Sequence, residues 1–190
     1  PKWFILFGLD RYLFGKFFSN RNEPLYTIGS SVGAWRMCCL AARDPVKCIE
    51  RLADYYCHEN YSHMTTVKEV TESARLMLEK ILIDDSKAAV VHNRVFKTHV
   101  VTVRSKGVNS SAGNSAHALH LGLSAVCNLF TRGSLHHFFD RSIFTTDMVS
   151  FPWSDSSEVG SISQLTEENL VEALLASGSI PFVLEGVNNI

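Results

Sequence analysis

A serine between two glycines is the part of this sequence that is best suited to do chemistry. Gly29, Ser31 and Gly33 have the spacing G-x-S-x-G, in which the serine occupies a sharp bend between a strand and a helix. Such a bend strains its apex residue, and crowding on both sides favours glycine two positions before and after it. The first N–H groups of the helix stabilise a developing oxyanion. Ser31 is therefore a candidate nucleophile for acyl transfer.

The residues around Ser31 have the order of elements that this bend requires. Residues 25–28 are predicted to form a short strand bounded by Pro24 and Gly29, and residues 34–42 are mostly apolar and favour a helix. The alternative is a tight turn without a catalytic role. The motif alone leaves that alternative open, because Gly and Ser are common residues.

The rest of the chain alternates between helical and strand patterns. We expect helices over residues 3–18, 45–56, 67–81 and 115–129, strands over 95–104 and 142–146, and a polar loop over 151–163. Asp44 should cap the second helix, Thr65 or Thr66 the third and Thr166 the last one, with Glu69 completing a capping box if Thr66 is the cap. The pattern predicts a single α/β domain over residues 1–190.

Two segments resemble the patatin-like phospholipases. Residues 27–35, TIGSSVGAW, are similar to the nucleophile segment of that family, G-T-S-x-G, with Ser30 in place of the common Thr. Residues 176–182, ASGSIPF, are similar to the A-S-x-A-x-P segment that lines the site at the end of a helix, with Ser179 in place of Ala.

The resemblance implies a three-layer α/β/α fold with a mostly parallel sheet and a Ser–Asp dyad. Ser31 would be the nucleophile on an elbow, with a lipid or other acyl ester as substrate. The odd number of cysteines separately favours a cytoplasmic location, which allows peripheral membrane contact. No cofactor or metal is implied. The elbow would comprise Gly29, Ser30, Val32 and Gly33, and the residues lining the site would be Ser177, Ser179 and Pro181.

Two elements of the family have no counterpart in this sequence. Before Ser31 there is no glycine-rich oxyanion loop, and no Asp is followed by Gly, as the catalytic D-G-[GA] segment would require. We therefore expect the sequence to be a fragment of a longer protein that lacks activity by itself.

Two other functions are compatible with the same residues. One is a non-catalytic lipid-binding or interaction module with this fold. The other is an α/β-hydrolase esterase, whose triad follows the order Ser, Asp or Glu, His. The acid would be Asp84, Asp85 or a Glu, and the histidine would be one of His92, His99, His117, His120 and His137. His117 and His120 share a helix face, but the sequence places no further metal ligand beside them.

Several other features have a structural interpretation that we favour over a functional one. Arg36 is expected to pair with a carboxylate rather than to contact a substrate head group. The aromatic residues over positions 3–18 are more typical of a core than of a lipid-facing surface. The five cysteines are expected to be reduced thiols.

Composition narrows the class of protein. The chain is 46% hydrophobic and 19% charged, which suits a folded domain. Its formal net charge of −1 gives no bulk electrostatic attraction to nucleic acid. No run of 18 apolar residues is present, so no spanning helix is predicted.

Overall fold

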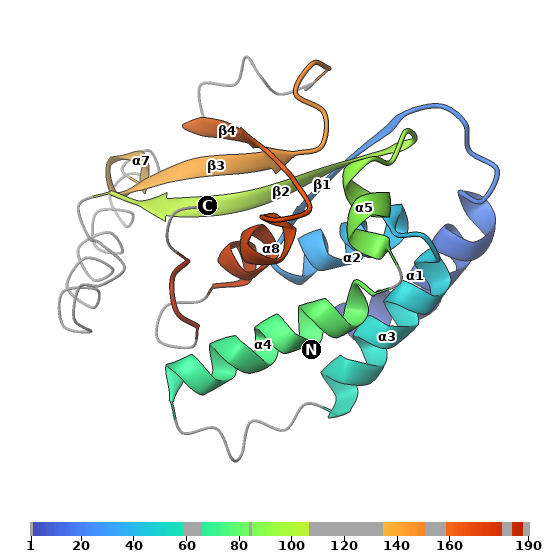
Figure 1. Ribbon diagram of the computed structural model, residues 1–190, viewed down its shortest axis with the longest axis horizontal. Helices are drawn as coiled ribbons and strands as arrows, with labels where there is room; N and C mark the ends of the chain where they lie inside the picture. The colour runs from blue at the N-terminus through green and yellow to red at the C-terminus, as the bar shows by residue number, and fades with distance from the viewer. Residues whose placement is uncertain are drawn as a thin grey trace.

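A four-stranded sheet in the order β1-β2-β3-β4 lies along one side of the part of the protein that the structure describes, and most of the described helices gather on one side of the sheet (Figure 1). The structure is a computed structural model, and it describes residues 2–58, 66–83, 85–106, 135–150, 159–179 and 184–187. The strands are β1 (Leu25–Ser30), β2 (Phe96–Ser105), β3 (Phe139–Thr145) and β4 (Ser161–Gln164). The β1–β2 and β3–β4 pairs are parallel and the β2–β3 pair is antiparallel. The predicted α/β class with a mostly parallel sheet is confirmed.

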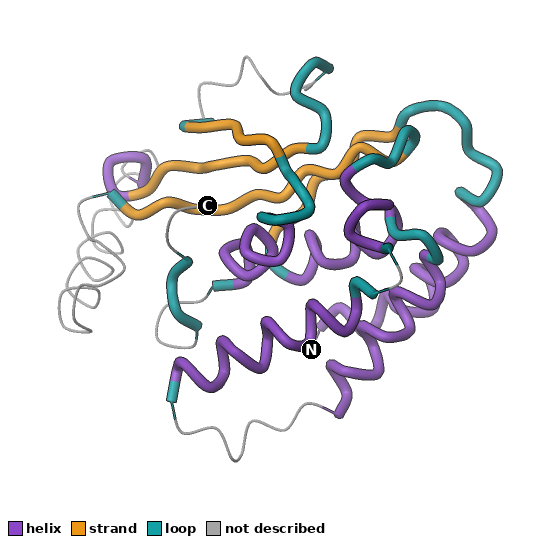
Figure 2. Tube along the Cα trace, viewed as in Figure 1, coloured by secondary structure: helices purple, strands orange, loops and turns teal. Residues whose placement is uncertain are grey.

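Helices precede, separate and follow these strands (Figure 2). The first helical segment is a 3₁₀ turn (η1), an α-helix (α1) and a π-helix (η2) in succession. The described helices are η1 (Lys2–Leu6), α1 (Phe7–Tyr12), η2 (Leu13–Phe17), α2 (Val32–Ala41), α3 (Pro45–His58), α4 (Val67–Ile81), α5 (Ser86–Val91), α7 (Leu135–Phe138) and α8 (Leu170–Gly178). The helix expected over residues 115–129 lies outside the described residues.

Two helices that are far apart in sequence pack together against the sheet. Helix α2 packs against β1 and β2, and α8 packs against β2 and against α2. The buried Trp35 of α2 joins the helices, because its Nε1–H donates to the Leu174 carbonyl at 3.0 Å. The ring of Trp35 also passes close to Gly178, where an added Cβ would lie 3.5 Å from it. The core formed this way fixes the end of α8 beside the start of α2.

The local start signals in the sequence place most helices correctly. Thr66 caps α4, and its reciprocal hydrogen bonds with Glu69 form the expected capping box. Asp44 caps α3 by accepting the Lys47 N–H at 3.1 Å. Thr166 and Asn169 exchange two side-chain to backbone hydrogen bonds in the same manner. That turn precedes α8, which begins only at Leu170, so the predicted start of the last helix is early.

The loop predicted over residues 151–163 is partly wrong. Its last residues belong to β4, and residues 151–158 lie outside the described residues. Serine-rich β4 has weak strand propensity, but its backbone pairs with β3 and Ser161 Oγ donates to Ser142 Oγ at 2.7 Å. Tertiary pairing thus overrides the local preference for a loop.

The prediction of a buried helix over residues 3–18 is half correct. Trp3 and Phe14 are buried, whereas Ile5, Leu9 and Phe17 are exposed. The change of helix type at Phe7 and Leu13 rotates successive side chains by different amounts. One side of this segment therefore joins the core and the other faces outward.

Candidate functional site

The turn from β1 into α2 is made by Ser31 alone. Strand β1 ends at Ser30 and α2 begins at Val32, so the strand–turn–helix order that the motif requires is present. Ser31 has φ 55° and ψ −138°, a conformation with positive φ that L-residues rarely adopt. Holding a non-glycine residue there costs about 1–3 kcal/mol. The surrounding fold therefore has to impose this conformation on Ser31.

Helix capping would be a simple reason for a serine at the start of α2, but the geometry of Ser31 rules it out. Serine is favoured at N-caps because its hydroxyl accepts an N–H from the first turn, usually from an extended backbone conformation. Ser31 occupies the cap position of α2, but its side chain makes no cap hydrogen bond. In the first turn, the Ala34 N–H donates to the Ser31 carbonyl at 2.9 Å. Capping therefore does not account for the serine.

The Ser31 hydroxyl is accessible. The residue is exposed, and within the described chain no hydrogen bond reaches its Oγ atom. It stands beside the N-terminal end of α2, where the helix dipole favours negative charge. An exposed hydroxyl at a strained bend above a helix N-terminus is the arrangement that nucleophilic acyl transfer uses.

The two glycines of the motif have different environments. A Cβ on Gly29 would lie 2.5 Å from the Ala34 nitrogen and 2.6 Å from its Cα, so the helix can pass this close only to glycine. A Cβ on Gly33 would meet nothing within 4 Å. The crowding predicted for both positions is therefore correct at Gly29 and wrong at Gly33. The space next to Gly33 is open.

Ser177 contacts the bend from the end of α8. The Ser31 N–H donates to Ser177 Oγ at 2.8 Å, and that hydroxyl donates to the Val101 carbonyl at 2.6 Å. Val101 of β2 is the register partner of Ser30 in β1. One serine thus links the bend, β2 and α8. The structure brings together the two segments that carry the family resemblance.

The other residues predicted around the elbow lie as follows. Ser30 is exposed at the end of β1, and Val32 is half-buried in the first turn of α2. Ser179 Oγ lies 2.9 Å from the Leu175 carbonyl and 3.0 Å from the Glu185 carbonyl, so it fastens the chain that follows α8. Pro181 lies outside the described residues.

The described histidines of the triad hypothesis have other partners or lie elsewhere. His99 is buried in β2 with Nδ1 2.8 Å from the Thr27 carbonyl, and burial lowers its pKa, which keeps the ring neutral. His92 precedes β2, at the strand end opposite Ser31, and its Nε2 lies 3.2 Å from Glu167 Oε1. His137 is exposed in α7, and His117 and His120 lie outside the described part.

Among the described residues, the acids of that hypothesis also do not bond to Ser31. Asp85 pairs with Arg43 at 3.1 Å, and Asp84 is not among the described residues. No described histidine or carboxylate hydrogen-bonds to Ser31 Oγ. The site as described holds a hydroxyl and a helix N-terminus.

Arg36 has a structural partner that the sequence did not identify. Its Nε and Nη2 donate to the two carboxylate oxygens of Asp10 at 2.7 and 2.5 Å. The Asp10 side chain is 1% exposed and that of Arg36 is 16% exposed. This bidentate pair fastens α1 to α2. The only sign of this pair in the sequence was the charged Asp10 within the apolar segment over residues 3–18.

The described cysteines are free thiols: Cys38, Cys39 and Cys48 are buried, and Cys57 is exposed. Among the described residues, no group of three or more His, Cys, Asp or Glu is placed to hold a metal ion. None of the helices in that part of the chain is long and apolar enough to cross a bilayer.

Comparison of the chain with protein-family models, with curated proteins and with solved structures gives no match. The interpretation of the site therefore depends on its own geometry.

Proposed function

We propose that this chain is the core of a serine acyl hydrolase of the patatin-like type, with Ser31 as the nucleophile and a lipid or other acyl ester as substrate. One observation carries the proposal. Ser31 is exposed and held at φ 55°, ψ −138°, yet its side chain does not cap α2. Backbone strain at a residue that forms no stabilising cap hydrogen bond is typical of a functional site.

The proposed chemistry follows from this position. Ser31 Oγ attacks the ester carbonyl carbon, the alcohol leaves, and water then hydrolyses the acyl-enzyme. The Val32 N–H, which belongs to the residue after the nucleophile, would contribute to the oxyanion hole together with the α2 dipole. A base must accept the Ser31 proton. In the patatin-like family this base is the Asp of a D-G-[GA] segment, which the sequence does not contain.

The proposal includes the three-layer form of the fold. Helices α2 and α8 cover one face of β1 and β2. Ile28 and Val103 lie on the other face, as the β1–β2 register indicates, and they are 45% and 63% exposed. His99 and Ile143 share that face and are buried, so the face is partly covered. Parallel sheets are normally covered on both faces, and this partial burial supports a further layer.

A cytoplasmic location with peripheral membrane contact is part of the same proposal. The exposed apolar side chains of Ile5, Leu9 and Phe17 on the first helical segment support contact with a lipid surface.

An active-site probe tests the proposal. The full-length protein is treated with a fluorescent fluorophosphonate, which phosphonylates activated serines, and compared with Ser31→Ala and with the adjacent, exposed control Ser30→Ala. We expect Ser31→Ala to abolish labelling and Ser30→Ala to retain most of it, with thermal unfolding showing that both variants are folded. Labelling that persists in Ser31→Ala would refute the assignment. A wild-type protein that remains unlabelled would support the non-catalytic module.

A further inference from the structure

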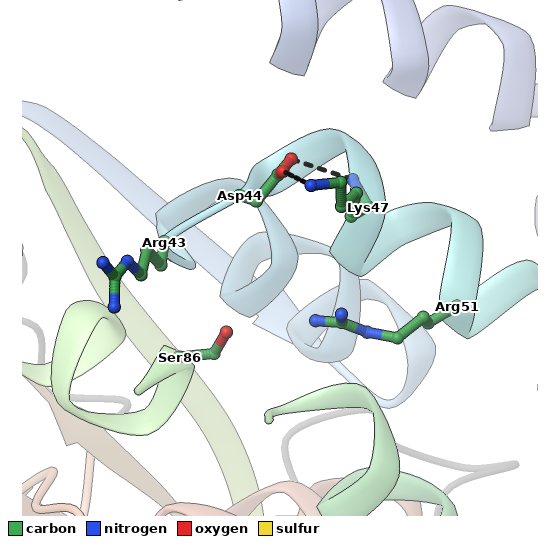
Figure 3. A pocket seen from close by; sticks show the side chains of 5 residues that line it. All are labelled: Arg43, Asp44, Lys47, Arg51 and Ser86. Atoms are coloured by element: carbon green, nitrogen blue, oxygen red, sulfur yellow. Dashed lines mark hydrogen bonds and ion pairs between the residues drawn. The ribbon is translucent and has the colours of Figure 1, made fainter. Parts of the chain in front are cut away.

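A pocket of about 270 Å³ lies at the opposite end of α2 from Ser31. Its lining residues come from the α2–α3 connection, from α3 and from the start of α5: Arg43, Asp44, Lys47, Arg51 and Ser86 (Figure 3). Helix α2 has 10 residues, so the pocket and Ser31 are separated by about 15 Å along the helix axis. The pocket is thus a separate site from the bend.

Positive charge dominates the lining. The lining has three cationic side chains and the Asp44 carboxylate, and Asp85 pairs with Arg43, so these groups together leave one positive charge, which favours an anion. The backbone N–H and ammonium of Lys47 hold the pKa of the Asp44 carboxyl below its usual value, so this residue stays ionised. Its carboxylate turns toward Lys47 N–H and Nζ, at 3.1 and 3.0 Å.

Within the described chain, exposed ion pairs hold two of the cations. Arg43 Nη1 lies 3.1 Å from Asp85 Oδ2, with side-chain exposures of 67% and 80%. Lys47 pairs with Asp44, with exposures of 74% and 46%. Exposed pairs of this kind contribute little to stability. Both side chains can therefore turn toward a bound anion at small energetic cost.

Arg51 is the fixed cation of the pocket. Its Nε and Nη2 lie 3.2 and 2.9 Å from the carbonyl of Ile81, the last residue of α4. These bonds hold the guanidinium in place on the wall of the pocket. A pre-positioned guanidinium loses little side-chain freedom when an anion binds.

Ser86 adds a hydroxyl to the lining of the pocket. The residue is 1% exposed, yet it lines the pocket, and no hydrogen bond of its Oγ occurs among the described residues. Figure 3 shows its hydroxyl directed into the space between Arg43 and Arg51. A phosphate oxygen in this space would accept its hydrogen.

We propose that this pocket binds the phosphate group of a phosphomonoester. Arg43, Lys47 and Arg51 supply the charge and Ser86 supplies a neutral donor. Pockets for drug-sized ligands span about 300–1,000 Å³. A pocket of about 270 Å³ has room for a phosphate group. This inference is independent of the role of Ser31.

Calorimetric titration of the full-length protein with inorganic phosphate tests the site. The double variant Arg43→Gln/Lys47→Gln should bind phosphate at least about tenfold more weakly, and Ser86→Ala about threefold or more. The matched control is Lys68→Gln/Arg94→Gln, which removes the same charge from exposed positions outside the pocket. It should keep the wild-type affinity within about twofold.

Equal weakening in the two double variants would show diffuse charge attraction and overturn the proposal, as would the absence of phosphate binding. The Arg43→Gln/Lys47→Gln comparison remains valid if Ser86→Ala fails to fold, because both of its positions are exposed or half-exposed. Ser31→Ala should leave phosphate affinity unchanged. Failure of this site is therefore distinguishable from failure of the hydrolase proposal.

Two further measurements identify the source of the phosphate. Glycerol 1-phosphate is titrated as a water-soluble monoester, and sedimentation is measured with phosphatidylcholine vesicles with and without phosphatidic acid. Sedimentation that requires phosphatidic acid and is lost in Arg43→Gln/Lys47→Gln assigns a lipid head group. Binding of glycerol 1-phosphate without such sedimentation assigns a soluble ligand. Absence of both would contradict the proposal.

Discussion

Ser31 and Asp85 are the two non-glycine residues with positive φ in the described part of the chain, and they differ in how that conformation is explained. Both stand at the cap position of a helix, α2 and α5 respectively. Asp85 has φ 59° and ψ 17°, the left-handed region that Asp tolerates through local hydrogen bonding. Ser31, with ψ −138°, lies in a region that is nearly restricted to glycine.

Asp85 thus makes an ordinary turn, and Ser31 makes a strained one. Asp85 needs only local chemistry. Ser31 is held by the close local passage of α2 over Gly29 and also by two tertiary contacts, the hydrogen bond to Ser177 and the pairing of Ser30 with Val101. Strain that the whole fold maintains at an exposed hydroxyl is the physical basis for assigning function there.

The largest effect should come from the glycine under the bend. Gly29→Ala would place a methyl group 2.5 Å from backbone, so we expect a loss of about 3 kcal/mol or more in unfolding free energy. Gly33→Ala meets no neighbour within 4 Å and lies in a helix, so it should be neutral or stabilising by about 0.5–1 kcal/mol. Urea unfolding of both variants measures the difference. Equal losses would mean that α2 does not pass as closely as described.

A smaller effect is expected at the hydroxyl that joins the bend to α8. Ser177→Ala leaves the Ser31 N–H and the Val101 carbonyl without their partner. The expected destabilisation is about 1–3 kcal/mol, accompanied by weaker fluorophosphonate labelling because Ser31 is less firmly held. The control Ser163→Ala changes a serine on β4, away from this bond network, and should leave labelling unchanged. An unaffected Ser177→Ala protein would show that the bend does not depend on this contact.

The strain itself can be measured by relieving it. Ser31→Gly should raise the unfolding free energy by about 1 kcal/mol while it abolishes labelling, because glycine adopts positive φ freely. Asp85→Gly should change stability less, since Asp already tolerates its conformation. Thermal and urea unfolding of the two variants compare the positions directly. A destabilised Ser31→Gly would argue against stored strain.

The smallest predicted effect is a pH dependence from His99, the buried histidine that donates to β1. Burial lowers its pKa, so the unfolded chain binds the proton more readily than the native state. The stability of the native state is therefore unaffected by protonation of His99 above the ordinary histidine pKa of about 6.5. Below that pH the free energy of unfolding falls, by at most about 1.4 kcal/mol per pH unit. His99→Gln should show a flatter stability profile between pH 7 and 5. An unchanged slope would contradict a neutral buried His99.

Local signals predicted the elements well, and tertiary pairing accounts for most of what they missed. The Thr66–Glu69 box and the bend at Ser31 are encoded within a few neighbouring residues, so the sequence was sufficient to predict them. Helix α5 has only 6 residues and begins after a left-handed residue, and serine-rich β4 exists because β3 pairs with it. Neither has a periodic pattern long enough to detect.

The parts of the site that join distant segments were harder to predict. The contact between Ser31 and Ser177 was accessible only through the family resemblance, because nothing in either segment alone specifies the other. The pairing of Asp10 with Arg36, and the meeting of Ser86 with Arg43 and Arg51, depend on how helices pack. Sequence periodicity gives the buried side of a helix, but not its neighbour.

We propose that the fold strains Ser31 in order to present a nucleophile. Mass-spectrometric mapping of the fluorophosphonate adduct on the wild-type full-length protein tests it most directly, because it needs no substitution that alters the bend. We predict a single major adduct on the peptide that contains Ser31, formed in the native protein and absent after denaturation. An adduct on another residue, or equal labelling of native and denatured protein, would contradict it.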